Sequence, residues 1–328
     1  MTASSRAEAL FIRILICATV FMLAFVFTVF MLSGRNSVAK DADTSADITT
    51  AAPTVANTPS YIPVSDEQTA IFDDAKLDAE YALLMDMQTG RVVASRHADR
   101  KIYPASMTKI MTMIVCCENI SDLTQKVAVS GDAIAAAYVE GASCAGFTAG
   151  ERVSVLELLY GTALPSGADA TGTLALYVAG SEKAFVDLMN TKAGELGLTN
   201  THFANASGLH DDDHYTTPRE MAAIVAYAMN NELCREILSA TSYTTAPTAE
   251  HPQGITMYST AFSRMSATKF GSAQIVAAKT GYTDEARFCL ASYAETDSGG
   301  RYVLITAAGS DRYAPVYDCK YVYENFTE

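Results

Sequence analysis

Hydrophobic positions are unevenly distributed along the chain. Residues 14–32 form an apolar run without a charged side chain. At about 1.5 Å per residue, a helix of this length can cross a bilayer core of about 30 Å. Residues 34–66 are rich in Thr, Ala, Ser, Asp and Pro, a composition that buries too little apolar surface to fold. From residue 67 onward the pattern is that of a globular domain.

This pattern predicts three parts: an N-terminal membrane anchor (residues 1–33), a flexible linker (34–66) and a folded domain (67–328). A cleavable signal peptide is the alternative to the anchor, because Ser37-Val38-Ala39 has the small-x-small form of a cleavage site. Signal-peptide cores usually span about 7–15 residues, so the longer run favours an uncleaved anchor.

The folded domain begins with a pattern typical of strands and continues with one typical of helices. Two β-favouring runs, Tyr81–Asp86 and 91–95, flank Gln88-Thr89-Gly90 and predict a hairpin. Apolar residues then recur at helical spacing from Met107 to Ile114. The clearest further helices are predicted at 155–164, 169–179, 183–196 and 218–229.

The last third of the domain returns to strand patterns. Strands are predicted at 275–278, 287–293 and 302–307, and the chain closes with a predicted helix over 313–326. Strands at both ends with helices between them predict an α/β fold, in which one sheet pairs the two ends of the domain and carries a helical insertion.

Charge and missing motifs argue against several classes of protein. Of 328 residues, 49% are hydrophobic, and 23 Lys and Arg against 37 Asp and Glu give a net charge of −14. The absence of a basic run argues against a nucleic-acid-binding protein. No dinucleotide, P-loop, zincin or nucleophile-elbow motif occurs. We therefore expect no cofactor.

The cysteines and histidines offer few metal sites. No Cys-x-x-Cys pair occurs among the seven cysteines, and we expect Cys116, Cys117 and Cys289 to be buried as small hydrophobic residues rather than disulfide partners. His210 and His214 are four residues apart, but Ser207-Gly208 and three Asp residues between the histidines favour a loop. We interpret this segment as a solvated loop rather than a metal site.

Ser-x-x-Lys occurs three times, and context separates the copies. The copy at 37–40 lies in the linker, and the copy at 266–269 runs into Gly271, which ends a helix. Only Ser106-Met107-Thr108-Lys109 opens a strongly amphipathic helix, where Ser106 and Lys109 share one face. The N-terminus of that helix also offers free N–H groups to a developing oxyanion.

Two further segments bear reactive side chains. Lys279-Thr280-Gly281 occurs once, at or near the end of the strand predicted at 275–278, and Gly281 allows a substrate backbone to approach. Leu164-Pro165-Ser166-Gly167-Ala168-Asp169 places a serine on a turn between two helices.

In this order, Ser106-x-x-Lys109, Ser166-Gly167 and Lys279-Thr280-Gly281 resemble the three motifs of penicillin-binding proteins and serine β-lactamases. The surrounding residues resemble the low-molecular-weight D-alanyl-D-alanine carboxypeptidases. The similar segments are Pro104-Ala105-Ser106-Met107-Thr108-Lys109, Phe203-Ala204-Asn205-Ala206-Ser207-Gly208-Leu209, and Lys279-Thr280-Gly281-Tyr282-Thr283 with Ala286. The resemblance covers about residues 77–325 and implies the β-lactamase/transpeptidase-like fold, an antiparallel sheet flanked by helices with an inserted helical subdomain.

The resemblance implies a catalytic role for three side chains. Ser106 is the expected nucleophile toward the penultimate D-Ala carbonyl of a peptidoglycan stem peptide, and β-lactams are the expected acylating inhibitors. Lys109 is the expected base, which needs a pKa lowered by burial and by a second cation, Lys279. Ser166 is expected to relay a proton to the leaving amine.

The resemblance also implies a binding role for the residues around the third motif. The backbone N–H groups of Ser106 and Tyr282 are expected to form the oxyanion hole. Lys279, Thr280 and Gly281 are expected to line the substrate site, and Thr280 with Arg264 is expected to bind the substrate carboxylate. A catalytic domain outside the cell membrane, held by the N-terminal helix, follows from the location of peptidoglycan.

Two departures from the family pattern leave alternatives open. Ala168 stands where the second motif usually has Asn, and a non-catalytic or slow penicillin-binding module is the resulting alternative. The usual C-terminal β-rich domain and amphipathic anchor are not found after Gly281. A class A β-lactamase is disfavoured because no convincing Glu-x-x-x-Asn loop lies between Ser166 and Lys279.

Overall fold

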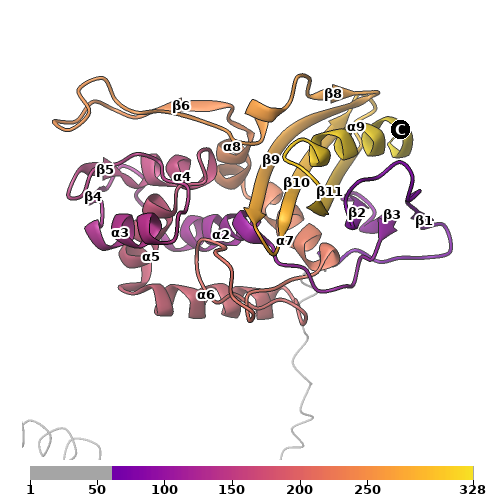
Figure 1. Cartoon of the computed structure of the whole chain (residues 1–328), viewed down its shortest axis with the longest axis horizontal. Coiled ribbons are helices and arrows are strands. Elements are labelled where there is room, and N and C mark those ends of the chain that lie inside the picture. Colours follow the sequence, from indigo (N-terminus) through magenta and orange to yellow (C-terminus); the bar gives the residue numbers. More distant parts are fainter. Residues whose placement is uncertain (1–60, 328) are drawn as a thin grey trace, which may run out of the picture. The chain divides into compact units, whose positions relative to one another are not determined.

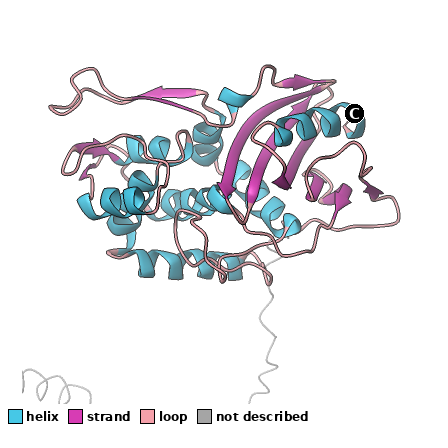
Figure 2. Ribbon diagram, viewed as in Figure 1, coloured by secondary structure: helices cyan, strands magenta, loops and turns pink. Residues whose placement is uncertain are grey.

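The computed structural model describes residues 61–327, in which a curved seven-stranded sheet stands beside a lobe made mostly of helices (Figure 1, Figure 2). The predicted anchor and residues 34–60 of the predicted linker lie outside the described residues. The sheet has the order β1-β3-β2-β11-β10-β9-β8. Its strands are β1 (Ala70–Ile71), β2 (Tyr81–Asp86), β3 (Arg91–Arg96), β8 (Lys269–Phe270), β9 (Ala273–Thr283), β10 (Arg287–Thr296) and β11 (Arg301–Gly309).

The central pairing of the sheet joins the two ends of the domain, as predicted. β2 and β11 are antiparallel, with Leu84 opposite Leu304, and only the short β1 pairs in parallel, with β3. The predicted α/β fold with an antiparallel sheet and an inserted helical subdomain is therefore confirmed.

The helices lie on both faces of the sheet and in the insertion. They are α2 (Lys109–Asn119), α3 (Gly131–Val139), α4 (Val155–Ala163), α5 (Ala168–Ala179), α6 (Glu182–Glu195), α7 (Pro218–Asn230), α8 (Glu232–Ser239) and α9 (Ala314–Phe326), with 3₁₀ turns η1 (Ala105–Thr108) and η2 (Phe262–Arg264). Two small two-stranded sheets complete the helical lobe: β4 (Lys126–Ala128) with β5 (Arg152–Ser154), and the hairpin of β6 (Ser242–Thr244) with β7 (Thr256–Tyr258). The sequence pattern is mostly helical up to about residue 240 but did not single out α3 or α8, and it did not predict these small sheets.

Successive side chains of β11 point to opposite faces of the sheet, and each face has its own hydrophobic core. Val303 and Ile305 belong to the core shared with α2 and α7, whereas Leu304 belongs to the core under α9, which includes Val322 and Tyr323. Because α2 contacts α4, α5, α6, α7 and α8, most of its residues are buried. The helix that follows Ser106 is thus the centre of the larger core.

The cysteines follow the prediction only in part. Cys116 and Cys289 are fully buried, as expected. Cys117 is only half-buried, and its Sγ lies 3.4 Å from Sγ of Cys234, because position 117 faces α8 at the edge of the core. The expectation of burial is therefore wrong for Cys117. Among residues 61–327, no helix combines the length and apolar composition that crossing a membrane requires.

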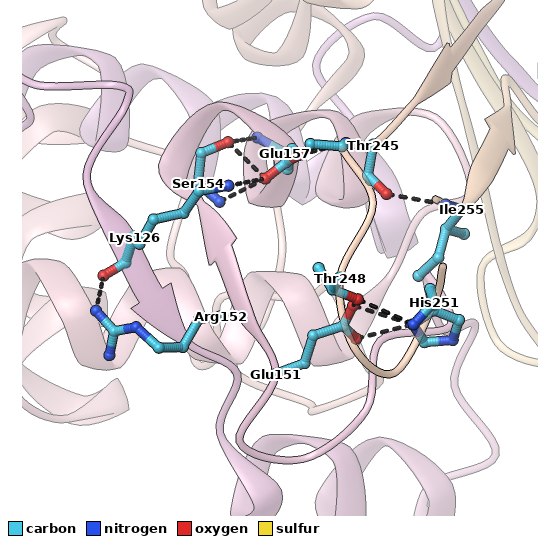
Figure 3. Close-up of polar contacts among 10 residues, drawn as sticks. Lys126, Glu151, Arg152, Ser154, Glu157, Thr245, Thr248, His251 and Ile255 are labelled. Carbon is cyan, nitrogen blue, oxygen red and sulfur yellow. Dashed lines mark hydrogen bonds and ion pairs between the residues drawn. The ribbon is translucent and has the colours of Figure 1, made fainter. Parts of the chain in front are cut away.

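The β6–β7 hairpin extends over the helical lobe and is attached there by two buried carboxylates (Figure 1, Figure 3). Glu151 accepts hydrogen bonds from the Thr248 hydroxyl and from Nδ1–H of His251. Glu157 caps α4 and also accepts the backbone N–H of Ala246. Burial alone would raise the pKa of Glu151, but its hydrogen bonds from Thr248, from a backbone N–H and from His251 outweigh burial and lower it.

We expect Glu151→Ala to lower the free energy of unfolding by about 2–4 kcal/mol at neutral pH, because the buried partners lose their acceptor. Urea unfolding followed by circular dichroism measures this. Since folding lowers the pKa of Glu151 below its ordinary 4.5, the carboxylate stabilises above that pH, and the difference from the wild type should shrink as pH falls further. Glu250→Ala is the matched control, because Glu250 is exposed on the same hairpin. Equal unfolding free energies for wild type and Glu151→Ala would contradict this anchoring role.

Candidate active site

Ser106 and Lys109 form the first part of the site at the start of α2. Ser106 lies in η1 and Lys109 is the first residue of α2, so the serine hydroxyl and the lysine amine are one turn apart on the same side. Nζ of Lys109 lies 3.1 Å from Oγ of Ser106. The predicted pairing of these two side chains is therefore present in the folded chain.

Two glycines from distant segments allow the backbone to close around this turn. A Cβ at Gly208, whose φ is +82°, would lie 1.9 Å from the carbonyl oxygen of Ala105. A Cβ at Gly281 would lie 2.8 Å from the carbonyl oxygen of Pro104 and 3.3 Å from the amide nitrogen of Ser106. Only glycine fits at either position. The close approach of Gly281 places β9 directly beside the serine.

Lys279 and Ser166 form a second pair that faces the same cleft. Nζ of Lys279 donates to Oγ of Ser166 at 2.9 Å and to the carbonyl oxygen of Thr280 at 3.1 Å. Ser166 has a φ of +65°, on the turn between α4 and α5. The structure extends the predicted strand to Thr283, so Lys279 lies inside β9 rather than at its end.

Both lysines are removed from water, and this lowers their pKa values. Lys109 is 2% exposed, and burial lowers its pKa to about 7 against the opposing charge of Asp169. Burial, followed by the charges of Lys109 and Arg264, holds the pKa of Lys279 well below its ordinary value. The expected lowered pKa of Lys109 is present. Burial is the largest cause, and the repulsion between the two ammonium groups appears in the lowered pKa of Lys279.

A cleft of about 700 Å³ opens over these residues. Ser106, Lys109, Ser166, Thr280, Gly281, Tyr282 and Arg264, all predicted from the sequence, line it. Lys279 lies beneath this surface and reaches the site through Ser166. The structure thus brings every predicted site residue to one place.

Two neighbouring arginines bring positive charge to one end of the cleft, whose lining also contains the acidic residues Glu140, Asp284 and Glu285. Arg264 and Arg312 both line it, and neither guanidinium forms an ion pair with a carboxylate of residues 61–327. Burial and then the neighbouring charge of Arg312 lower the pKa of the half-buried Arg264. Thr280 lies nearby in the cleft, and its Oγ1 is 2.7 Å from Oγ1 of Thr260. Sequence reasoning missed Arg312 and Thr260, because neither lies in a recognisable motif.

The segment 140–146 forms the wall beside Ala168. The backbone N–H of Ala168 donates to the carbonyl oxygen of Ser143 at 2.7 Å, and Ser143 lines the cleft. The buried carboxylate of Asp169 accepts the N–H groups of Ala145 at 2.8 Å and Gly146 at 3.3 Å. Asp169 therefore holds this wall, a role that its position in the sequence did not reveal.

The segment 203–214 supports the turn η1, which carries Ser106, and the start of α2. Nζ of Lys109 donates to the carbonyl oxygen of Ser207 at 2.6 Å, and Oγ1 of Thr112 donates to that of Ala206 at 2.6 Å. The prediction of a solvated loop is right for His210, which is exposed at the cleft. It is wrong for His214, which is 2% exposed because the loop folds back on itself. Residues 61–327 contain no cluster of three His, Cys, Asp or Glu side chains placed to hold a metal ion.

Residues 67–308 match the family model described as Peptidase_S11, D-alanyl-D-alanine carboxypeptidase. The chain is 33% identical over 239 residues to D-alanyl-D-alanine carboxypeptidase DacF of Bacillus subtilis (strain 168), a match that covers 72% of this chain and 59% of that protein. It is also 33% identical over 233 residues to a D-alanyl-D-alanine carboxypeptidase of Streptomyces sp. (strain K15), covering 69% of this chain and 79% of the relative.

A solved structure shares the fold. The crystal structure of the Streptomyces K15 DD-transpeptidase superposes with a TM-score of 0.67 at 31% sequence identity, covering 74% of this chain and 94% of that one. The family match spans well over half of the chain and includes all the residues that meet in the cleft except Arg312. This chain therefore belongs to the D-alanyl-D-alanine carboxypeptidase family of serine peptidases, Peptidase_S11.

Proposed function

We propose that this chain is a serine-type D-Ala-D-Ala carboxypeptidase that removes the terminal D-Ala from peptidoglycan stem pentapeptides. One observation carries the proposal: the Ser106 hydroxyl lies 3.1 Å from a buried lysine amine whose pKa is about 7. Near neutral pH a substantial fraction of such an amine is unprotonated and can accept the hydroxyl proton. A serine beside an ordinary, charged lysine has no such base.

The pair of Ser106 and Lys109 can carry out acylation of the enzyme. As Lys109 takes the proton of Ser106, Oγ attacks the carbonyl carbon of the penultimate D-Ala and a tetrahedral oxyanion forms. Because β9 runs beside the amide of Ser106, we assign the oxyanion hole to the backbone N–H groups of Ser106 and Tyr282. The negative charge of the oxyanion is stabilised by these two N–H donors, which the fold already holds in place.

The pair of Ser166 and Lys279 serves the departure of D-Ala, which precedes release of the product. Ser166 donates its proton to the leaving amine as the C–N bond breaks, and the proton that Lys109 took from Ser106 passes to Ser166. The hydrogen bond from Lys279 holds the Ser166 oxygen during this transfer. Water then attacks the ester carbonyl on Ser106, the ester bond breaks, and the shortened stem peptide departs while the serine regains its proton. Both steps fit a cleft with two serine–lysine pairs.

The cationic end of the cleft supports binding of a free C-terminal carboxylate. Arg264 was expected to make this contact with Thr280, and Arg312 adds a second guanidinium at the same end. Their charges repel each other and have no carboxylate partner within residues 61–327, so an anionic substrate group relieves the repulsion. Such a site favours removal of a terminal residue over cleavage within a chain.

Ala168 supports a second candidate, a slow or non-catalytic penicillin-binding module. An Asn at this position would contact the lysine of the nucleophile helix and the acyl-side amide of the substrate, and Ala cannot. A missing hydrogen bond typically costs about 1–3 kcal/mol, roughly 10- to 100-fold in rate. Because enzymes accelerate reactions by about 10⁶-fold or more, we favour a slowed enzyme over an inactive one.

We also propose an extracytoplasmic location, with residues 1–33 as a single membrane anchor and residues 34–66 as the linker. Support comes from the uncharged run 14–32 and from the substrate, which lies outside the membrane.

The function is tested by turnover of a diacyl-Lys-D-Ala-D-Ala peptide compared with turnover of penicillin. We expect release of D-Ala and a stable penicillin adduct on Ser106, detected by intact-protein mass spectrometry. Ser106→Ala, which removes only the hydroxyl, is the matched control and should show neither. A penicillin adduct without release of D-Ala would favour the binding module, and fast penicillin turnover would favour a β-lactamase. No adduct after long incubation at roughly millimolar drug would exclude the acylation mechanism.

The rate of acylation by penicillin should depend on the protonation of Lys109. Below its pKa of about 7 the amine is charged and cannot act as a base, so the rate should rise about tenfold per pH unit up to about pH 7 and level off above it. Stopped-flow acylation between about pH 5 and about pH 9 measures this profile. Lys109→Arg should be folded yet unacylated throughout, because Arg stays charged. A flat wild-type profile, or an adduct on Lys109→Arg, would exclude Lys109 as the base.

Protease treatment of intact protoplasts tests the location. An exposed domain should be released as a soluble fragment cut within residues 34–66, because this segment has the composition of a flexible linker. The activity of the released fragment toward the peptide is the control for its integrity. Complete protection of the domain until the protoplasts are lysed would contradict the extracytoplasmic location.

A further inference from the structure

His214 is buried at the end of the segment 203–214, which supports the turn η1 that carries Ser106. Its ring is 2% exposed and meets the ring of Phe203 edge-on, with centroids 5.6 Å apart and planes at 73°. Backbone pairing of Tyr215 with His202, and of Thr216 with Ile102, holds the chain directly after the histidine. The ring is thus fixed in position and lies outside the cleft lining.

The hydrogen bonds of the ring define its tautomer. Nδ1 accepts the backbone N–H groups of Ala204 at 3.1 Å and Asn205 at 3.4 Å, so Nδ1 carries the lone pair. Burial lowers the pKa of His214 to about 4, so the ring is neutral at physiological pH and its single proton is on Nε2. Nε2–H then donates to Oγ1 of Thr108, 2.7 Å away.

Thr108 links this histidine to the reacting groups. It lies in η1 between Ser106 and Lys109 and is 1% exposed. The turn begins at Ala105, which has a φ of +46°, a left-handed conformation that costs about 1–3 kcal/mol for a residue other than glycine. Such a conformation persists only where its surroundings enforce it. The bond from His214 is one such contact, and it acts on the residue next to the base.

We propose that His214 is a positioning residue for acylation: through Thr108 it holds the turn that sets Oγ of Ser106 against Nζ of Lys109. The role rests on the proposed function, because it concerns the rate at which Ser106 is acylated. His214 does not line the cleft, whereas His210 does. Its loss should therefore reduce the acylation rate while leaving substrate binding nearly unchanged.

Substitutions at both ends of the bond provide the test. Gln can place an amide nitrogen near the position of Nε2 and keep the bond to Thr108, whereas Asn can replace only the acceptor at Nδ1. We expect His214→Asn and Thr108→Val to slow penicillin acylation about 10- to 100-fold, with the peptide KM within about threefold of the wild type. His214→Gln and Thr108→Ser, which retain the hydrogen bond, should stay within about threefold in rate.

A double variant separates this role from a general loss of stability. If the bond carries the effect, His214→Asn combined with Thr108→Val should be no slower than the slower single variant. His202→Gln is the control, because His202 is exposed and hydrogen-bonds the carbonyl of Asp213 rather than the turn. Thermal melts establish the folded fraction, and rates are compared per folded molecule.

The outcomes are distinct. Absence of a penicillin adduct on the wild type overturns the proposed function and this role with it. An acylated wild type with unchanged rates in Thr108→Val and His214→Asn overturns the role of His214 alone. Equal losses in His214→Gln and His214→Asn, or additive losses in the double variant, show that the ring contributes packing rather than position, and this also overturns the proposal.

Discussion

Two lysine amines are held away from water in this domain, and much of the surrounding structure can be understood from that constraint. A charged ammonium in an apolar interior is costly unless it loses its proton or gains acceptors. Lys109 has the carbonyl oxygen of Ser207 and the hydroxyl of Ser106 as acceptors, and Lys279 has the hydroxyl of Ser166 and the carbonyl oxygen of Thr280. The acceptors that make burial tolerable are therefore the same serine hydroxyls that the reaction uses.

The geometry of these pairs depends on contacts between segments far apart in the chain. η1 lies against β9 from the last third of the domain and against Gly208 from the helical insertion. The absence of a side chain at Gly208 and Gly281 lets both backbones approach the strained turn at Ala105. Because the sheet pairs β2 with β11, the two ends of the domain bring β9 to this position.

Two neighbouring arginines concentrate positive charge at one end of a cleft that acidic residues also line. The protein carries a net charge of −14, yet Arg264 and Arg312 stand at one end of the cleft without a carboxylate partner within residues 61–327. Localised positive charge in a concave site attracts an anionic group more strongly than the same charge on a flat, solvated surface. The proposed selection of a free terminal carboxylate follows from this local charge.

The sequence by itself determined the features that depend on local spacing. The helical period places Ser106 and Lys109 on one face, and alternating apolar residues identify the principal strands, so the fold class and the three motifs could be read directly. Only the tertiary structure decided what depends on distant partners. Burial is the largest cause of the lowered pKa of Lys109, Asp169 holds the segment 140–146, and Arg312 comes close to Arg264 only in the folded chain. His214 is buried although its neighbours in the sequence are polar. Local pattern predicts which face a residue occupies, but the dielectric environment and hydrogen-bond partners of a side chain are set by segments that folding brings together.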